Sequence, residues 1–173
     1  ERSGEKVDYA AITAEAAASA PFVSVLPNID DPRLIAPENM VELLQTMCRE
    51  AGLPVPETRG AIIRCALESL ALKYRRTLRM IDGLLGRTTE VLHIIGGGTQ
   101  NKLLCQMTAD ACGIPVVTGP VEATALGNIG VQAMAVGAVE SLAEMRAIIA
   151  RSIELEHYAP KDSAPWDTID ARG

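Results

Sequence analysis

Apolar residues recur every three or four positions along the longest regular stretch of the chain, from about Glu57 to Leu85. This spacing places them on one face of a helix. They are Ile63, Leu67, Leu70, Tyr74, Leu78 and Ile81. The other faces carry basic residues, and a charged face of this kind is usually solvated. We therefore expect a long amphipathic helix whose basic side chains contact water, namely Arg64, Lys73, Arg75, Arg76 and Arg79.

Two shorter helices are predicted before it. The alanine-rich stretch from Val7 to Ala20 is the first, and Pro21 ends it. The second opens at Pro37, a residue favoured in the first helical turn, and runs to about Glu50. The segment between the two helices holds several prolines and an acidic pair, and we interpret it as an irregular surface connection.

The hydrophobic pattern changes after the long helix. Short apolar runs at Val91 to Ile95 and at Pro115 to Thr118 predict strands. Helices are predicted at Thr99 to Cys112, Glu122 to Val136 and Ser141 to Ile153. Strands that alternate with helices are typical of an α/β sheet with crossover helices. The tail, residues 159–173, holds two prolines and is predicted to be irregular.

Charge and hydropathy narrow the possible partners. Acidic residues outnumber basic ones 22 to 16, which gives a net charge of −6 and disfavours nucleic acid or an anionic membrane as the main partner. No apolar run approaches the length that a bilayer span requires, and mixed charges before Tyr9 argue against a signal peptide. We expect a cytoplasmic globular protein.

The four cysteines show no CxxC pair and no histidine at ligand spacing, so neither a zinc site nor any other metal site is predicted; they are Cys48, Cys65, Cys105 and Cys112. Two of them, Cys48 and Cys65, flank a loop between predicted helices, so their sulfur atoms could come close. In a cytosolic protein we expect both thiols to be reduced.

The most informative motif is VLHIIGGGTQNKLL, in which a strand runs through Gly96, Gly97 and Gly98 into a helix. Such a turn lets a ligand reach bare N–H groups at a helix start, which suits phosphates. A dinucleotide fingerprint would need a third glycine where Asn101 stands, and no GxxxxGK[ST] loop is present. A plain turn without ligand remains an alternative. Asn101 offers a donor and an acceptor to a planar heterocycle, although asparagine also caps helices.

Two other features have structural interpretations. Small residues between Gly119 and Gly137, among them Gly127 and Gly130, favour close helix packing. His93 lies in the middle of a predicted strand, so we expect a core histidine with a satisfied hydrogen bond.

The segment IIGGGTQNKLLCQMTADACGIPVVTGPVEATALGNIGVQAMAVG resembles the C-terminal signature of the FGGY family of carbohydrate kinases. The DDPRLIAPENM loop, the CREAGLPVPET linker and the RCALESLALKYR helix extend the resemblance over essentially the whole chain. The resemblance implies the α/β class with an actin-like (ribonuclease H-like) ATPase fold. Residues 1–173 would form part of the C-terminal, nucleotide-binding lobe of a two-lobe sugar kinase.

The resemblance also implies roles for particular residues. The backbone at Gly97 would lie near the nucleotide, with Gly98 as its neighbour and Asn101 beside the adenine. ATP and Mg²⁺ are the implied cofactors, and the implied reaction transfers the γ-phosphate to a ketose. The lobe that carries the sugar pocket and the aspartate base does not precede Glu1, so no catalytic residue is assigned and the isolated chain is expected to be inactive. The alternatives are a kinase for a different pentulose or hexulose, or an actin-like binding module without chemistry.

Overall fold

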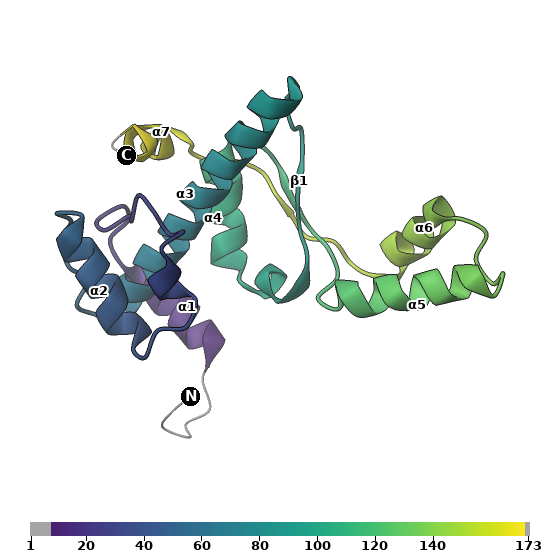
Figure 1. The fold of residues 1–173 in the computed structure, drawn as a ribbon, viewed down its shortest axis with the longest axis horizontal. Helices are drawn as coiled ribbons and strands as arrows, with labels where there is room; N and C mark the ends of the chain where they lie inside the picture. Colours follow the sequence, from purple (N-terminus) through teal and green to yellow (C-terminus); the bar gives the residue numbers. More distant parts are fainter. Residues whose placement is uncertain (1–7, 172–173) are drawn as a thin grey trace.

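The computed structural model describes residues 8–171, and most of them lie in helices (Figure 1). The elements in chain order are α1 (Tyr9–Ala18), the 3₁₀ helix η1 (Pro32–Leu34), α2 (Met40–Glu50), α3 (Arg59–Leu85), β1 (Leu92–Ile94), the 3₁₀ helix η2 (Gly96–Gln100), α4 (Lys102–Cys112), β2 (Val116–Thr118), α5 (Ala123–Ala135), α6 (Leu142–Ser152), β3 (His157–Tyr158) and α7 (Ala164–Asp170).

The helices and strands predicted before residue 153 are confirmed, with shifts of a few residues at their ends. The predicted first position of α1, Val7, lies outside the described residues. Side-chain caps explain several of the observed helix starts. Asp8 accepts hydrogen bonds from two N–H groups in the first turn of α1, and Thr58 accepts one at the start of α3. Gly86, in the left-handed conformation at φ +62°, ends α3.

The three strands form one small sheet in the order β1-β2-β3. β1 and β2 are parallel, with Leu92 opposite Val116, and α4 makes the crossover between them. β3 pairs with β2 in the antiparallel sense. Within the described residues β1 therefore forms an open edge of the sheet, and the glycine turn follows directly from that edge strand.

The hydrophobic core lies around α3, which crosses the middle of the molecule (Figure 1). One cluster joins α1, α3, α4 and α7, and its largest members include Leu72, Met107 and Trp166. A second cluster lies between α2 and α3. The long helix thus links the two N-terminal helices to the sheet and its crossover helix.

The prediction of an irregular tail is wrong for residues 164–170, which form α7. Pro165 lies in the first turn of this helix, where its missing N–H is not needed. Trp166 is buried in the main cluster, and its ring meets that of Phe22 edge to face with centroids 4.9 Å apart. The end of the described chain is therefore part of the core.

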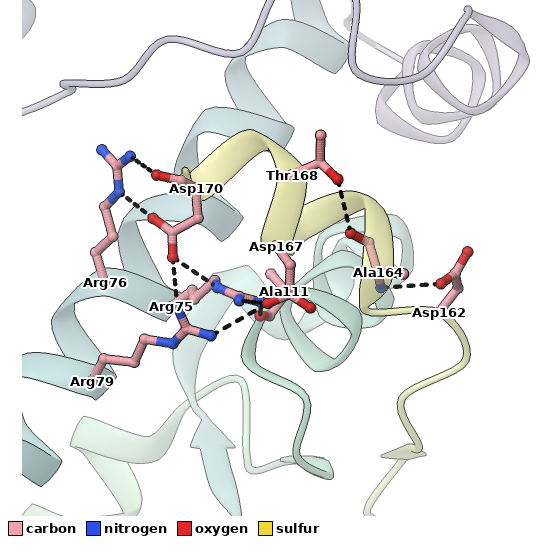
Figure 2. A network of polar contacts seen from close by, with 9 residues as sticks. All are labelled: Arg75, Arg76, Arg79, Ala111, Asp162, Ala164, Asp167, Thr168 and Asp170. Atoms are coloured by element: carbon pink, nitrogen blue, oxygen red, sulfur yellow. Dashed lines mark hydrogen bonds and ion pairs between the residues drawn. The ribbon is translucent and has the colours of Figure 1, made fainter. Parts of the chain in front are cut away.

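The expectation that the basic side chains of α3 are solvated is wrong for Arg75, whose side chain is 3% exposed. Figure 2 shows why: the guanidinium donates to the carboxylate of Asp170 (3.0 Å), to the carbonyl oxygen of Ala111 (2.6 Å) and to Asp167. Arg76 and Arg79 also donate to Asp170, each at 2.7 Å. The basic face of α3 is thus the surface that holds α7.

Arg64 is a second exception to that expectation. Its side chain is 13% exposed, and it pairs with the buried Glu68 one turn along α3 at 2.7 Å. It also donates to the carbonyl oxygen of Ala16 at 3.1 Å, which ties α3 to the end of α1. Glu68 in turn accepts two hydrogen bonds from the N–H of Phe22.

The sulfur atoms of Cys48 and Cys65 lie 3.9 Å apart, which confirms that these residues come close across the helix pair. Both are buried free thiols. Burial raises the pKa of Cys65 to about 12, so its sulfur stays protonated at neutral pH.

The helices α5 and α6 pack on each other and project from the rest of the molecule (Figure 1). Gly130 explains the close approach predicted for α5, because a Cβ there would meet the sulfur of Met145 on α6 at 1.9 Å. Gly127 has open space at the corresponding position and makes no such contact. In residues 8–171 no helix is long and apolar enough to cross a membrane.

Candidate functional site

The three glycines form the start of a 3₁₀ helix rather than an open loop. β1 ends at Ile94, the chain stays extended at Ile95, and η2 then begins at Gly96. Gly96 has φ +79°, a left-handed conformation that glycine adopts without steric cost. Its N–H donates to the carbonyl oxygen of Pro120 at 3.0 Å, which fixes the turn against the segment that follows β2.

Gly97 is the glycine that leaves the backbone accessible. It is exposed, and a Cβ built on it would meet nothing within 4 Å. Within residues 8–171, no backbone acceptor is recorded for the N–H groups of Gly97 and Gly98, as is usual in the first turn of a helix. A bound molecule can therefore touch the main chain here and receive hydrogen bonds from it.

Asn101 joins the glycine turn to α4 and caps that helix. Its side-chain oxygen accepts the N–H of Leu104 at 3.0 Å, which confirms the capping use that the sequence suggested. The side-chain NH₂ group has no protein acceptor among the described residues. Asn101 can thus keep its structural contact and still donate to a ligand.

A cleft of about 660 Å³ separates the glycine turn from α1. Its lining residues come from two segments some ninety positions apart in the sequence: Tyr9, Ala10 and Thr13 from one wall, and Gly97, Gln100, Asn101 and Lys102 from the other. The volume lies within the range that is usual for small-molecule sites. The cleft brings together two of the predicted site residues, Gly97 and Asn101.

Gly98 lies on a different side of the turn. It lines a separate apolar hollow of about 340 Å³ between β1 and α3, together with side chains such as Leu78 and Ile81. A Cβ at Gly98 would lie 3.8 Å from Cγ2 of Ile94. Gly98 is thus not among the residues that line the cleft, although it belongs to the same glycine turn as Gly97.

Charge near the cleft is largely neutralised. The amino group of Lys102 pairs with Glu156 at 2.5 Å, and this hydrogen bond raises the pKa of Lys102. His93, which we expected in the core, is exposed on the edge strand β1. Successive side chains of a strand point to opposite faces of the sheet, and His93 is exposed whereas Leu92 and Ile94 are half-buried, so His93 lies on the less covered face of β1.

The described part of the cleft does not fit a magnesium ion. None of the side chains from residues 8–171 that line it is a carboxylate, whereas protein-bound Mg²⁺ usually takes one or two. Elsewhere in the described ranges, no three His, Cys, Asp or Glu side chains gather as a metal site would require.

Sequence reasoning missed the other residues that line the cleft, of which Tyr9 and Gln100 have side-chain groups without a recorded partner among residues 8–171. Tyr9 is an exposed aromatic residue at the first position of α1, and nothing in the local pattern links it to a glycine turn so far along the chain. Gln100 stands next to Asn101 in the motif itself. Its place directly before Asn101 was the signal in the sequence that could have identified Gln100.

Parallel strands joined by a glycine turn and a crossover helix place the chain in the α/β class, and two solved structures show that its fold is actin-like. The chain is similar to xylulose kinase from Rhodospirillum rubrum, with a TM-score of 0.54 and 23% identity over 70% of this chain and 25% of that one. It is also similar to Plasmodium falciparum glycerol kinase, crystallised with ADP, with a TM-score of 0.61 and 19% identity over 95% of this chain and 34% of that one.

The chain belongs to the FGGY family of carbohydrate kinases, since residues 1–136 match the family's C-terminal domain. It is 50% identical to the rhamnulokinase of Bacteroides thetaiotaomicron over 159 residues, which is 92% of this chain and 33% of that protein. It is 44% identical to the rhamnulokinase of Yersinia pestis over 152 residues, 88% of this chain and 31% of that protein. The chain thus spans about a third of the length of the curated relatives that it matches.

Proposed function

We propose that this chain is the nucleotide-binding part of a rhamnulokinase, a cytoplasmic enzyme of rhamnose catabolism that transfers the γ-phosphoryl group of ATP to L-rhamnulose. The observation that carries the proposal is the open backbone at Gly97 and the half-free amide of Asn101 at one cleft, in a chain 44–50% identical to rhamnulokinases. The glycerol kinase with a similar fold was crystallised with ADP, which supports an adenine nucleotide as the ligand.

The cleft suits the adenosine end of the nucleotide better than its phosphates. Phosphates attract unpaired cations, but Lys102, the one cationic side chain of residues 8–171 that lines the cleft, is held by Glu156. The polar groups that remain are backbone N–H groups and side-chain amides, which match the donors and acceptors of a heterocycle. We assign Gly97 and Asn101 to contacts with the adenosine.

Phosphoryl transfer depends mainly on positioning and charge neutralisation. This chain's residues would hold one end of the nucleotide and so orient the triphosphate. Mg²⁺ is the metal that normally accompanies ATP and neutralises phosphate charge. Since no carboxylate of residues 8–171 lines the cleft, we place no metal ligand and no catalytic base among these residues. The isolated chain is expected to bind nucleotide without phosphorylating a sugar.

The test is calorimetric titration of the 173-residue chain with MgADP, in parallel with Gly97→Val. A branched side chain at position 97 fits the folded protein but would occupy the space next to the turn, so binding should be lost while the fold persists. The near-ultraviolet circular dichroism of Trp166, the one tryptophan in the sequence, reports the core in both proteins. Gly83→Val is the matched control, because Gly83 also has open space and lies on α3 outside the cleft.

Equal ADP affinity in wild type and folded Gly97→Val would refute the adenosine assignment. The alternatives predicted from the sequence, another ketose kinase or a module without chemistry, make different predictions for a protein that also contains the remaining two thirds of the relatives' length. A rhamnulokinase would phosphorylate L-rhamnulose in preference to other ketoses such as xylulose. A binding module would phosphorylate none of them.

A further inference from the structure

The wall of the cleft formed by α1 has no role in the function proposed so far. Tyr9 is the first residue of this helix, it is 71% exposed, and it lines the cleft across from Gly97. Its phenol has no recorded hydrogen-bond partner in the part of the chain that the structure describes. An exposed aromatic ring that borders a cleft of this size offers a flat surface for a planar ligand.

The position of Tyr9 is well fixed despite its exposure. Asp8 caps α1 with hydrogen bonds of 3.0 and 3.1 Å to the next turn. Further along, α1 lies against α3 so closely that a Cβ on Gly60 would come within 2.6 Å of the carbonyl oxygen of Glu15. Arg64 on α3 also donates to the end of α1, at Ala16. The ring of Tyr9 is thus carried by a helix that the core holds in place.

The opposite wall contributes a free carboxamide. Gln100 is exposed in the cleft, and no hydrogen bond of its side chain is recorded among residues 8–171. Its neighbour Asn101 uses its oxygen for the cap and keeps its NH₂ group available. A carboxamide presents a donor and an acceptor side by side, and the edge of adenine presents the complementary pair at its amino group and ring nitrogen.

The other polar side chains of residues 8–171 that line the cleft are engaged. The hydroxyl of Thr13 donates to the carbonyl oxygen of Tyr9 at 2.8 Å, and Lys102 pairs with Glu156. Among the described residues, the groups left to recognise a ligand are therefore an aromatic face, two amides and open backbone. These groups favour a heterocyclic base over a sugar or a phosphate.

We propose that Tyr9 stacks on the adenine base and that Gln100 hydrogen-bonds its edge, so that α1 and the glycine turn together select adenine over guanine nucleotides. This inference rests on the function proposed above, and it adds base-binding residues that lie outside the Gly97 and Asn101 pair. At its N7 edge adenine presents an acceptor and a donor, whereas guanine presents two acceptors, so a carboxamide can pair with both groups of adenine but with only one of guanine.

The first experiment compares the ADP affinity of the 173-residue chain with that of Tyr9→Ala and Tyr9→Phe. Loss of a stacking ring should weaken binding by about 5- to 100-fold in Tyr9→Ala, whereas Tyr9→Phe keeps the ring and should bind within about twofold of wild type. Because Tyr9 is exposed, neither change should alter the core, and Trp166 fluorescence checks this.

The second variant is Tyr9→Trp, which gives a signal that a merely structural role would not produce. Trp166 is 2% exposed, so the wild-type emission should not respond to ADP, whereas the new indole at position 9 should be quenched as the base stacks on it. Gln100→Ala should lower the ratio of ADP to GDP affinity, measured in the same titrations.

The outcomes separate the two proposals. If the folded wild-type chain does not bind ADP, both the proposed function of the cleft and this inference are overturned. If wild type binds ADP and loses it in Gly97→Val, but Tyr9→Ala binds as tightly as wild type and Tyr9→Trp is not quenched, the adenosine assignment stands and the role of Tyr9 is wrong. An unchanged ADP to GDP ratio in Gln100→Ala would overturn the role of Gln100.

Discussion

Arg75 holds a full positive charge in the core, with its three acceptors provided by α4 and α7. A buried charge of this kind is tolerated only while its partners remain. The two carboxylates differ in their surroundings: the side chain of Asp170 is 14% exposed and that of Asp167 is 64% exposed. The pair therefore allows a comparison of two acceptors for one guanidinium.

We predict that Asp170→Ala lowers the free energy of unfolding by about 3 kcal/mol, because it leaves Arg75 without its less exposed carboxylate partner. Asp167→Ala removes an exposed partner of the same arginine and should cost at most about 1 kcal/mol. Urea unfolding followed by Trp166 fluorescence measures both values at pH 7. Equal decreases in the free energy of unfolding of the two variants would contradict the idea that the less exposed carboxylate stabilises Arg75 more.

The lowered pKa of Asp170 predicts that the free energy of unfolding depends on pH. Burial works against the charged form of Asp170, but the hydrogen bonds from Arg76 and Arg75 outweigh it and hold its pKa below the usual value. The stabilisation is therefore fully present above the pKa of the unfolded chain, about 3.9, and is lost as pH falls through the lower folded value. In the same urea titrations repeated down to pH 3, Asp170→Ala should lose less stability with acid than wild type.

Individual residues show which features of the site and the core could be predicted from the sequence. Gly97 and Asn101 were predicted as site residues because they stand within one short motif, and the structure brings both to one cleft. Tyr9 and the burial of Arg75 escaped prediction because their neighbours lie some ninety residues away. No local pattern distinguishes an arginine that meets water from one that meets a distant aspartate.

At the scale of elements, α1 packs against α3 and carries one wall of the cleft. Gly60 allows this contact, since any Cβ there would approach the backbone of Glu15 and the hydroxyl of Ser19 at 2.6 Å. Gly83 lies on the same helix with open space around it. Substitutions at the two glycines therefore distinguish the effect of close packing, at Gly60, from the effect of helix propensity, at Gly83.

We predict that Gly60→Ala destabilises the protein by about 1–3 kcal/mol, because α1 must move away from α3. Gly83→Ala should instead stabilise it by up to about 1 kcal/mol through helix propensity. Since α1 carries one wall of the cleft, Gly60→Ala should also weaken ADP binding while Gly83→Ala leaves it unchanged. Thermal unfolding and calorimetry measure the two effects, and a Gly60→Ala protein as stable as Gly83→Ala would disprove the close contact.

Elements differ in how well the sequence foretold them. The helix α3 and the alternation from β1 to α6 follow from hydrophobic spacing alone and were predicted. The helix α7 was not, because its prolines dominated a short segment. With Pro165 in the first turn and Trp166 and Ile169 three positions apart on the buried side, the same residues are consistent with a helix once the surface that covers them is known.

At the scale of the whole molecule, the packing is uneven. The helices α1, α3, α4 and α7 share one core, whereas α5 contributes one buried residue, Gly130, and exposes large apolar side chains such as Ile129 and Val131. A helix with apolar residues on most of its faces is normally covered. In this chain it is stabilised mainly by its contact with α6.

We predict that amide hydrogens in α5 and α6 exchange much faster than those in α3 and α4, because opening the projecting pair exposes little buried surface. Hydrogen–deuterium exchange with mass spectrometry on the 173-residue chain measures the difference. The core of α3 should exchange only through global unfolding, which the Asp170→Ala variant accelerates. Comparable protection in α5 and α3 would show that the projecting pair is as stable as the core.

The ion pair between Arg75 and Asp170 also has a consequence for the synthesis of the protein on the ribosome. The two residues lie 95 positions apart, and a ribosome adding about 5–20 residues per second needs roughly 5–20 s to make that length of chain. Once Cys112 has been made, the nascent chain has its long helix and crossover helix but still lacks the tryptophan and the carboxylates that complete their surface. Folding of the core must then wait until Asp170 has been made, and the unfinished surface is one that chaperones would be expected to bind.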